Sequence, residues 1–210
     1  MELDLITAID WSTFFDYLAV IIGAVTGALF AAVRKLGIVG SVALGVITAY
    51  GGGIIRDTLL STHGFFFMQH PLLIMACTFI SAGIFVFSRT VRKLESGLFY
   101  ADAFSMSWYA LAGTVKTWNA DVGIMPAIIL GTVTAIGGGA LRDICTGETP
   151  AIFKESSYYA IAAFSGAVFF VVCESIEAPF LFASIGCIMV SFALTWACKH
   201  FGWCTTRKKE

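Results

Sequence analysis

The chain has 210 residues, of which 58% are hydrophobic and only 13% are charged, and its formal net charge at pH 7 is -1. Several apolar runs reach the roughly 20 residues that a helix needs to cross about 30 Å of hydrocarbon, which predicts an all-α membrane protein. The chain has no basic patch of the kind that binds nucleic acid. It also lacks metal-ligand spacing among its cysteines, a nucleophile–base pair and a phosphate loop, so no enzyme is indicated.

Seven membrane-spanning helices are predicted within a single transmembrane domain over 1–210, in the segments 12–33, 37–61, 71–88, 97–116, 122–146, 157–173 and 179–198. Cytoplasmic loops are enriched in Lys and Arg, so the basic residues predict the orientation. Only Arg56 and Lys116 fall on one side. The basic residues on the other side are Arg34, Lys35, Arg89, Arg92, Lys93, Arg142, Lys154, Lys199, Arg207, Lys208 and Lys209. We therefore expect the N-terminus outside and the C-terminus in the cytoplasm.

The chain contains an internal repeat. A shift of 86 residues aligns 16–57 with 102–143 without a gap, and fourteen of the forty-two pairs are identical. Because 86 residues contain three predicted spans, the second copy enters the membrane in the opposite direction. The sequence thus predicts two inverted three-helix repeats, about 12–88 and 97–173, and a seventh helix at about 179–198. Inverted repeats place a solute path at their interface, near the middle of the membrane.

The motif T-A-x-G-G-G-x-x-R-D occurs once in each copy, at 48–57 and 134–143. A glycine in a helix interior costs roughly 1 kcal/mol against alanine, so each triplet predicts a broken or kinked helix. Threonine one turn earlier either replaces backbone bonds freed by the bend or coordinates a cation. The candidate kink and pore residues are Gly51, Gly52, Gly53, Gly137, Gly138, Gly139, Thr48 and Thr134.

Charged residues accompany both triplets, although an unpaired charge in hydrocarbon costs several kcal/mol. Neighbouring residues point in different directions from a helix, so Arg56–Asp57 and Arg142–Asp143 are expected to find partners on other helices. Asp16 and Asp102, early in their spans, either neutralise these arginines, attract cations to the two mouths, or stabilise a helix N-terminus. The charges either hold the helices together, contact the ion directly, or do both.

In the paired motifs and the early acidic residues, nearly the whole chain resembles the trimeric intracellular cation channels, in particular their prokaryotic branch, some of whose members are called glycine transporters. The resemblance implies two inverted three-helix repeats plus a seventh helix. It also implies a homotrimer with one potassium-permeable pore in each protomer, lined by the kinked second and fifth helices at Gly51–Gly53 and Gly137–Gly139. The chain lacks the Lys-Glu-Val triplet that animal members use with phosphoinositide lipid.

Two functions fit this pattern. A channel in a bacterial inner membrane would use carbonyls and hydroxyls near the kinks as weak ligands for potassium. A secondary transporter of a small zwitterion such as glycine would use helix N-termini for the carboxylate and carbonyls for the ammonium. The residues favour both equally, and the resemblance favours the channel. Either function needs no cofactor and no fixed metal, and the expected partners are further copies of the chain and membrane lipid.

Overall fold

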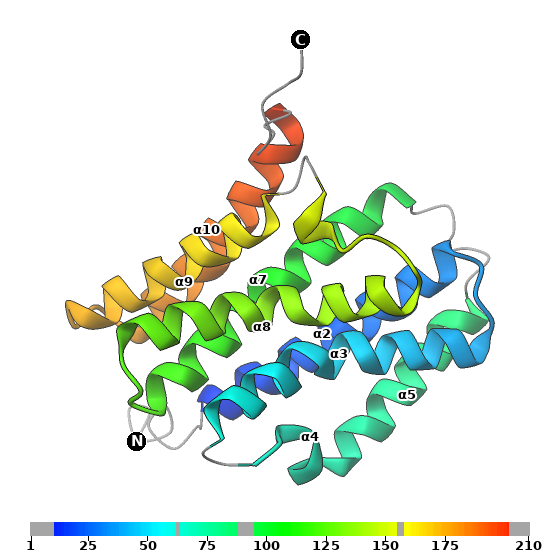
Figure 1. Cartoon of the computed structure of the whole chain (residues 1–210), viewed down its shortest axis with the longest axis horizontal. Coiled ribbons are helices and arrows are strands. Elements are labelled where there is room, and N and C mark those ends of the chain that lie inside the picture. The colour runs from blue at the N-terminus through cyan, green and yellow to red at the C-terminus, as the bar shows by residue number, and fades with distance from the viewer. Residues whose placement is uncertain (1–10, 62–63, 88–94, 155–157, 202–210) are drawn as a thin grey trace.

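The computed structural model describes residues 11–61, 64–87, 95–154 and 158–201, and all regular structure in these ranges is helical (Figure 1). The elements are α2 (Trp11–Val33), α3 (Ile38–Leu60), α4 (Phe66–Gln69), α5 (Pro71–Val86), α7 (Glu95–Asn119), α8 (Ile124–Cys145), the 3-10 helix η2 (Ala151–Phe153), α9 (Tyr159–Ser175) and α10 (Phe180–Phe201). This architecture confirms the predicted all-α class.

Each of the seven predicted segments contains one long helix, displaced by at most three residues at either end. The helices α2, α3, α8 and α10 are long and apolar enough to cross a membrane, and α5 and α9 are shorter apolar helices. The number of helices that cross the membrane therefore stays a prediction. Of the basic residues used for the orientation, Arg89, Arg92, Lys93, Arg207, Lys208 and Lys209 lie outside the described ranges.

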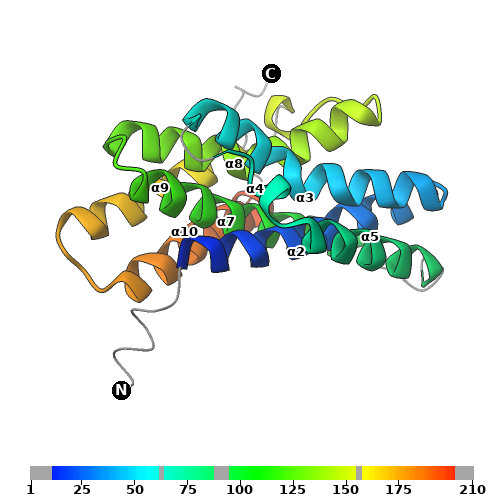
Figure 2. The same cartoon turned by 90° about the horizontal axis from the view of Figure 1, so that it is seen from below.

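The long helices form two bundles of three. The first consists of α2, α3 and α5, and the second of α7, α8 and α9. Contacts of α3 with α8 and of α2 with α7 join the bundles, while α10 packs against α7 and α9 (Figure 1). Figure 2 shows α3 and α8 together on one side of the molecule, with α2 beneath them. The helices that contain the two glycine triplets therefore meet at the centre.

The backbone repeats along with the sequence. The turn between α2 and α3 contains Lys35 with φ 60°, and the turn between α7 and α8 contains Asp121 with φ 52°. These residues are 86 positions apart. A left-handed conformation is uncommon for residues other than glycine, so its occurrence at equivalent positions shows that both helix pairs reverse direction in the same way.

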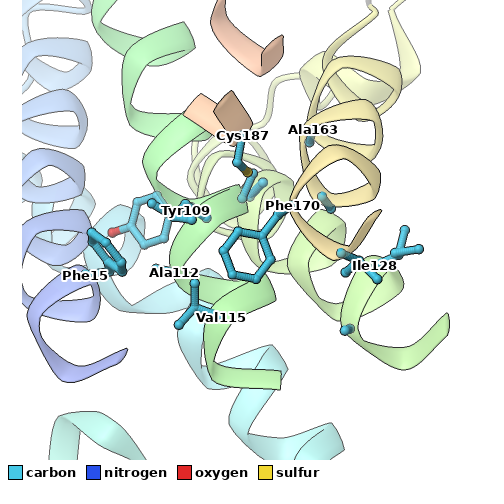
Figure 3. Close-up of a cluster of buried hydrophobic side chains, with 14 of the residues drawn as sticks. Phe15, Tyr109, Ala112, Val115, Ile128, Ala163, Phe170 and Cys187 are labelled. Carbon is cyan, nitrogen blue, oxygen red and sulfur yellow. The ribbon is translucent and has the colours of Figure 1, made fainter. Parts of the chain in front are cut away.

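The main buried cluster lies where α7, α8, α9 and α10 meet α2, and it is rich in alanine around Tyr109 and Phe170 (Figure 3). Small residues let helix backbones approach closely, which is how helices associate where no water drives them together. Gly166 of α9 illustrates this, because a Cβ at this position would overlap the side chain of Ser191 in α10. Large apolar side chains such as Phe79 and Leu181 are left exposed on the outside.

Candidate functional site

The glycine triplets lie where α3 crosses α8. A Cβ on Gly52 would overlap the carbonyl oxygen of Thr134, and a Cβ on Gly138 would overlap the carbonyl oxygen of Thr48. Contacts that exchange in this way require two antiparallel helices related by an approximate twofold axis, as an inverted repeat predicts. Glycine is needed at the crossing because the two backbones touch there.

The third glycine of each triplet has different surroundings. A Cβ on Gly51 would lie 3.3 Å from the Cα of Gly138, whereas a Cβ on Gly53 would meet no atom nearer than Nη2 of Arg56, at 3.9 Å. In the second copy, a Cβ on Gly139 would likewise lie 3.8 Å from Nη2 of Arg142. The first two glycines therefore serve the crossing, and the third leaves open space beside the arginine.

The triplets do not break the helices, and a kink without a break stays a prediction. The α-helix α3 continues through Gly51–Gly53, and α8 continues through Gly137–Gly139. Glycine lowers the stability of a helix only in comparison with a residue that could pack at the same position. At this crossing no larger residue fits. Close packing of the two backbones thus offsets the low helix propensity.

The two threonines bond within their own helices. The hydroxyl of Thr48 donates to the carbonyl of Leu44 at 2.7 Å, and that of Thr134 donates to the carbonyl of Leu130 at 2.6 Å. Because both helices are continuous, these bonds do not replace freed backbone bonds; they are the usual contacts of a threonine one turn back along a helix. Of the two roles considered from the sequence, coordination of a cation by the hydroxyl oxygen stays a prediction.

The first charge cluster consists of Asp16, Arg56, Asp57 and Lys116. Arg56 donates to both carboxylate oxygens of Asp16, at 2.7 and 3.1 Å, and its Nε donates to Asp57 at 2.9 Å. The ammonium of Lys116, from α7 of the other repeat, lies 3.1 Å from Asp16 and 3.5 Å from Asp57. Two positive and two negative side chains make this cluster formally neutral.

The second charge cluster consists of Asp102, Arg142 and Asp143, with Tyr159 and Phe30 beside them. Arg142 donates to Asp102 at 2.8 Å and to Asp143 at 2.9 and 3.0 Å. The hydroxyl of Tyr159 donates to Asp102 at 3.2 Å, and the guanidinium lies 4.2 Å from the centre of the Phe30 ring. Among the described residues, Arg142 is the basic partner of the two carboxylates, so the formal charge is -1.

These contacts correct one prediction and show one of the three roles considered for the early aspartates. Each arginine does pair with the aspartate that follows it, because its long side chain bends back and its planar fork reaches two carboxylates at once. The early aspartates neutralise the arginine of their own repeat, Asp16 with Arg56 and Asp102 with Arg142. Each cluster thus ties the end of one motif helix to the first helix of the same bundle.

The motif aspartates also hold two short helices that the sequence analysis missed. The second carboxylate oxygen of Asp57 accepts the backbone N–H of Phe66, at the start of α4, at 2.9 Å. Asp143 accepts the N–H of Ala151, at the start of η2, at 3.1 Å. The one signal for these elements is the similar distance from each aspartate to a short apolar stretch, nine and eight residues further along the chain.

Two narrow cavities lie on either side of the α3–α8 crossing. One is lined by Asp102, Arg142 and Gly139, together with Thr48 from the first repeat. The other is lined by Asp16, Arg56 and Gly53, together with Thr134 from the second repeat. Tyr109 lines both. Each cavity thus combines the charge cluster of one repeat with the threonine of the other.

A wider cavity of about 280 Å³ adjoins the first charge cluster. It shares Asp57 and Phe66 with the narrow cavity of that cluster, and its wall also includes Lys116 and His70. The described part of the chain contains no group of three or more His, Cys, Asp or Glu side chains that could hold a metal ion. Hydroxyl and carboxylate oxygens line these cavities beside the guanidinium groups of Arg56 and Arg142 and the ammonium of Lys116, and oxygen ligands suit a hard monovalent cation.

Comparison with known proteins gives consistent relatives. A family model described as glycine transporter matches the chain twice, over residues 13–89 and 99–175, which coincide with the two repeats. The solved structure of the trimeric intracellular cation channel orthologue from Rhodobacter sphaeroides is 31% identical, with a TM-score of 0.86, over 93% of this chain and 100% of that one. A second solved structure, of a trimeric intracellular cation (TRIC) channel, is 28% identical, with a TM-score of 0.80, over 94% of this chain and 97% of that one. The inner membrane protein YadS of Escherichia coli is 28% identical over 183 residues, 87% of this chain and 88% of that protein.

Proposed function

Since the chain belongs to the family of the trimeric intracellular cation channels and their prokaryotic relatives, we propose that it conducts monovalent cations, potassium above all, through each protomer. The observation that carries this proposal is the pair of cavities on either side of the α3–α8 crossing. Relatives of this chain are membrane proteins and channels rather than enzymes. The motif helices α3 and α8 form the centre of the proposed path.

The path we propose enters through the wide cavity beside Lys116, passes the first charge cluster, continues past Tyr109 beside the α3–α8 crossing, and leaves past Asp102 and Arg142. At each stage an oxygen atom is available to replace part of the hydration shell of the ion. Weak ligands suit conduction, because an ion has to leave each position as readily as it enters.

We further propose that the chain forms a homotrimer in a bacterial inner membrane, with its N-terminus outside. A relative in this family is named as trimeric, and the E. coli relative is named as an inner membrane protein. The many exposed apolar side chains on the outer faces of the helices, such as Phe79 and Leu181, would be covered by neighbouring subunits and lipid.

Transport of a small zwitterion such as glycine is the second candidate, and the description of the family model favours it. The arginine–aspartate clusters on the cavity walls offer both charges that a zwitterion needs. The two candidates differ in mechanism, because a carrier binds one solute per conformational cycle whereas a channel passes many ions while it stays open.

Reconstitution of the purified chain separates the two candidates. In planar bilayers under potassium and sodium gradients, the channel predicts discrete current steps with a reversal potential set by the potassium gradient. Silent bilayers together with saturable glycine uptake by liposomes would replace the channel with the carrier. Heat-inactivated protein, reconstituted in the same way, controls for leakage.

A further inference from the structure

Tyr109 of α7 lies at the boundary between the two halves of the proposed path. Its side chain is buried, and its hydroxyl donates a 2.6 Å hydrogen bond to the backbone carbonyl of Ala49, in α3 of the other repeat. It is a wall residue of both narrow cavities. Figure 3 shows the ring extending from α7, with the hydroxyl directed away from Phe170 and toward α2.

A glycine on α2 makes room for this hydroxyl. A Cβ on Gly23 would overlap the hydroxyl oxygen of Tyr109 and would lie 2.9 Å from the Cα of Ala49. The Tyr109 side chain therefore passes through a notch between α2 and α3 that a larger residue would close. The hydrogen bond depends on two residues that come from opposite repeats.

The notch and the tyrosine occupy equivalent positions in the two repeats, because Gly23 and Tyr109 are 86 residues apart. The same shift relates Ala49 to Ala135. Thus the carbonyl of Ala49 accepts a hydrogen bond from a phenol, whereas Gly23, at the position equivalent to Tyr109, has no side chain that could donate to the carbonyl of Ala135. The twofold relation between the repeats is broken here, and the bonded carbonyl belongs to the first repeat alone.

We propose that the Tyr109 side chain is the barrier between the two half-paths and that its hydroxyl occupies the Ala49 carbonyl, which a permeating cation requires as a ligand. The inference rests on the proposed channel function and names the residue that limits it. A helical carbonyl has a second lone pair, which the phenol uses in this structure. When the hydroxyl leaves, that lone pair faces the cavity at the boundary between the two half-paths, and the cation gains an oxygen ligand.

A purely structural role for Tyr109 predicts a different result. Tyr109 packs in the main buried cluster beside Phe15 and Met106, so its removal would lower stability whatever its place in the path. The substitution Tyr109→Phe keeps the ring and its packing and removes only the hydroxyl. A structural role predicts a small loss of stability and no change in current.

The decisive experiment records single-channel potassium currents from purified full-length protein, comparing the parent with Tyr109→Phe. A buried hydrogen bond is worth about a fivefold change in an equilibrium, so we expect the open probability of Tyr109→Phe to rise about fivefold. Tyr109→Ala, which also removes the ring, should raise the unit conductance as well. Tyr100→Phe is the matched control, because it makes the same change on the same helix at an exposed site outside the cavities.

Gly23→Ala provides a second variant, since its methyl group overlaps the hydroxyl of Tyr109; it would also lie 2.9 Å from the Cα of Ala49, so its thermal unfolding is compared with that of the parent. It should raise the open probability as Tyr109→Phe does, and the double variant should show no further increase. If the parent conducts and both variants match it, the barrier assignment is overturned while the channel stands. If parent and variants are all silent, the channel proposal fails and this inference fails with it.

Discussion

The two charge clusters share a motif and differ in what the other repeat adds to it. In the first cluster, α7 supplies Lys116, whose ammonium lies beside both carboxylates. In the second, α2 supplies Phe30, whose ring covers the guanidinium of Arg142. Positions 30 and 116 are equivalent under the shift of 86 residues. The motif therefore forms the same arginine–aspartate arrangement in both repeats. One residue from the opposite repeat, Lys116 or Phe30, then determines the formal charge of each cluster.

This difference gives the two ends of the proposed path unlike electrostatics. A formally neutral cluster lies next to the wide cavity, whereas a cluster with a charge of -1 lines the cavity at the other end. The second cluster attracts a cation through its formal negative charge. In the first cluster, Lys116 neutralises the corresponding charge. A duplicated motif thus need not give a symmetrical function.

The largest expected effect tests what the two repeats have in common. Gly52→Ala and Gly138→Ala each place a methyl group against a backbone carbonyl across the crossing, so we expect the potassium current to be lost in both. Gly83→Ala is the matched control, because it changes a helical glycine of α5 whose methyl group would meet no atom within 4 Å. Bilayer recordings, with size-exclusion profiles to verify folding, measure the outcome. Normal currents in the Gly52 and Gly138 variants would remove the crossing from the mechanism.

The second prediction separates the clusters by stability. Arg142→Ala leaves the buried carboxylate of Asp143 and the partly buried one of Asp102 without a basic partner, which costs about 3–5 kcal/mol. Arg56→Ala should cost less, because Lys116 remains beside Asp16 and Asp57. Thermal unfolding in detergent at pH 7 measures both. If Arg142→Ala is as stable as the parent, the cluster does not hold the helices together.

Hydropathy and the repeat predict the fold well, because both depend on local composition. The long helices, the inverted relation and the pairing of each motif with an early aspartate all lie within these patterns. The roles of Lys116 and Tyr109 do not, since each acts on the opposite repeat, and no spacing along the chain reveals such a contact. Similarly, helix propensity alone predicts a break at Gly51–Gly53, because it omits the α8 backbone that packs there.

The third prediction concerns the ring in the second cluster. Phe30→Leu keeps an apolar side chain and removes the π-face over Arg142, and a desolvated cation–π contact is worth about 2 kcal/mol. We expect a corresponding loss of stability at pH 7 in detergent. In the Arg142→Ala background the same substitution should cost much less, because the cation is gone. Equal costs in both backgrounds would assign Phe30 to packing alone.

The smallest expected effect tests the charge difference itself. Lys116→Met removes the ammonium and keeps an unbranched chain of similar length, so the first cluster acquires the formal charge of -1 that the second already has. Arg56 still pairs with both carboxylates, as Arg142 does in the second cluster, and a partly exposed ion pair contributes about 1 kcal/mol or less. The effect on stability should therefore be small.

The current is the more informative measurement for this variant. Added negative charge near the wide cavity concentrates cations there, so the Lys116→Met conductance should exceed that of the parent by about twofold at low salt. The Debye screening length falls to about 3 Å at 1 M salt, so the conductances of Lys116→Met and the parent should then converge. Lys116→Arg, which keeps the charge, should behave as the parent at both salt concentrations. A conductance difference that persists at high salt would indicate that Lys116 narrows the path sterically, and the contrast between the clusters would then be one of shape rather than charge.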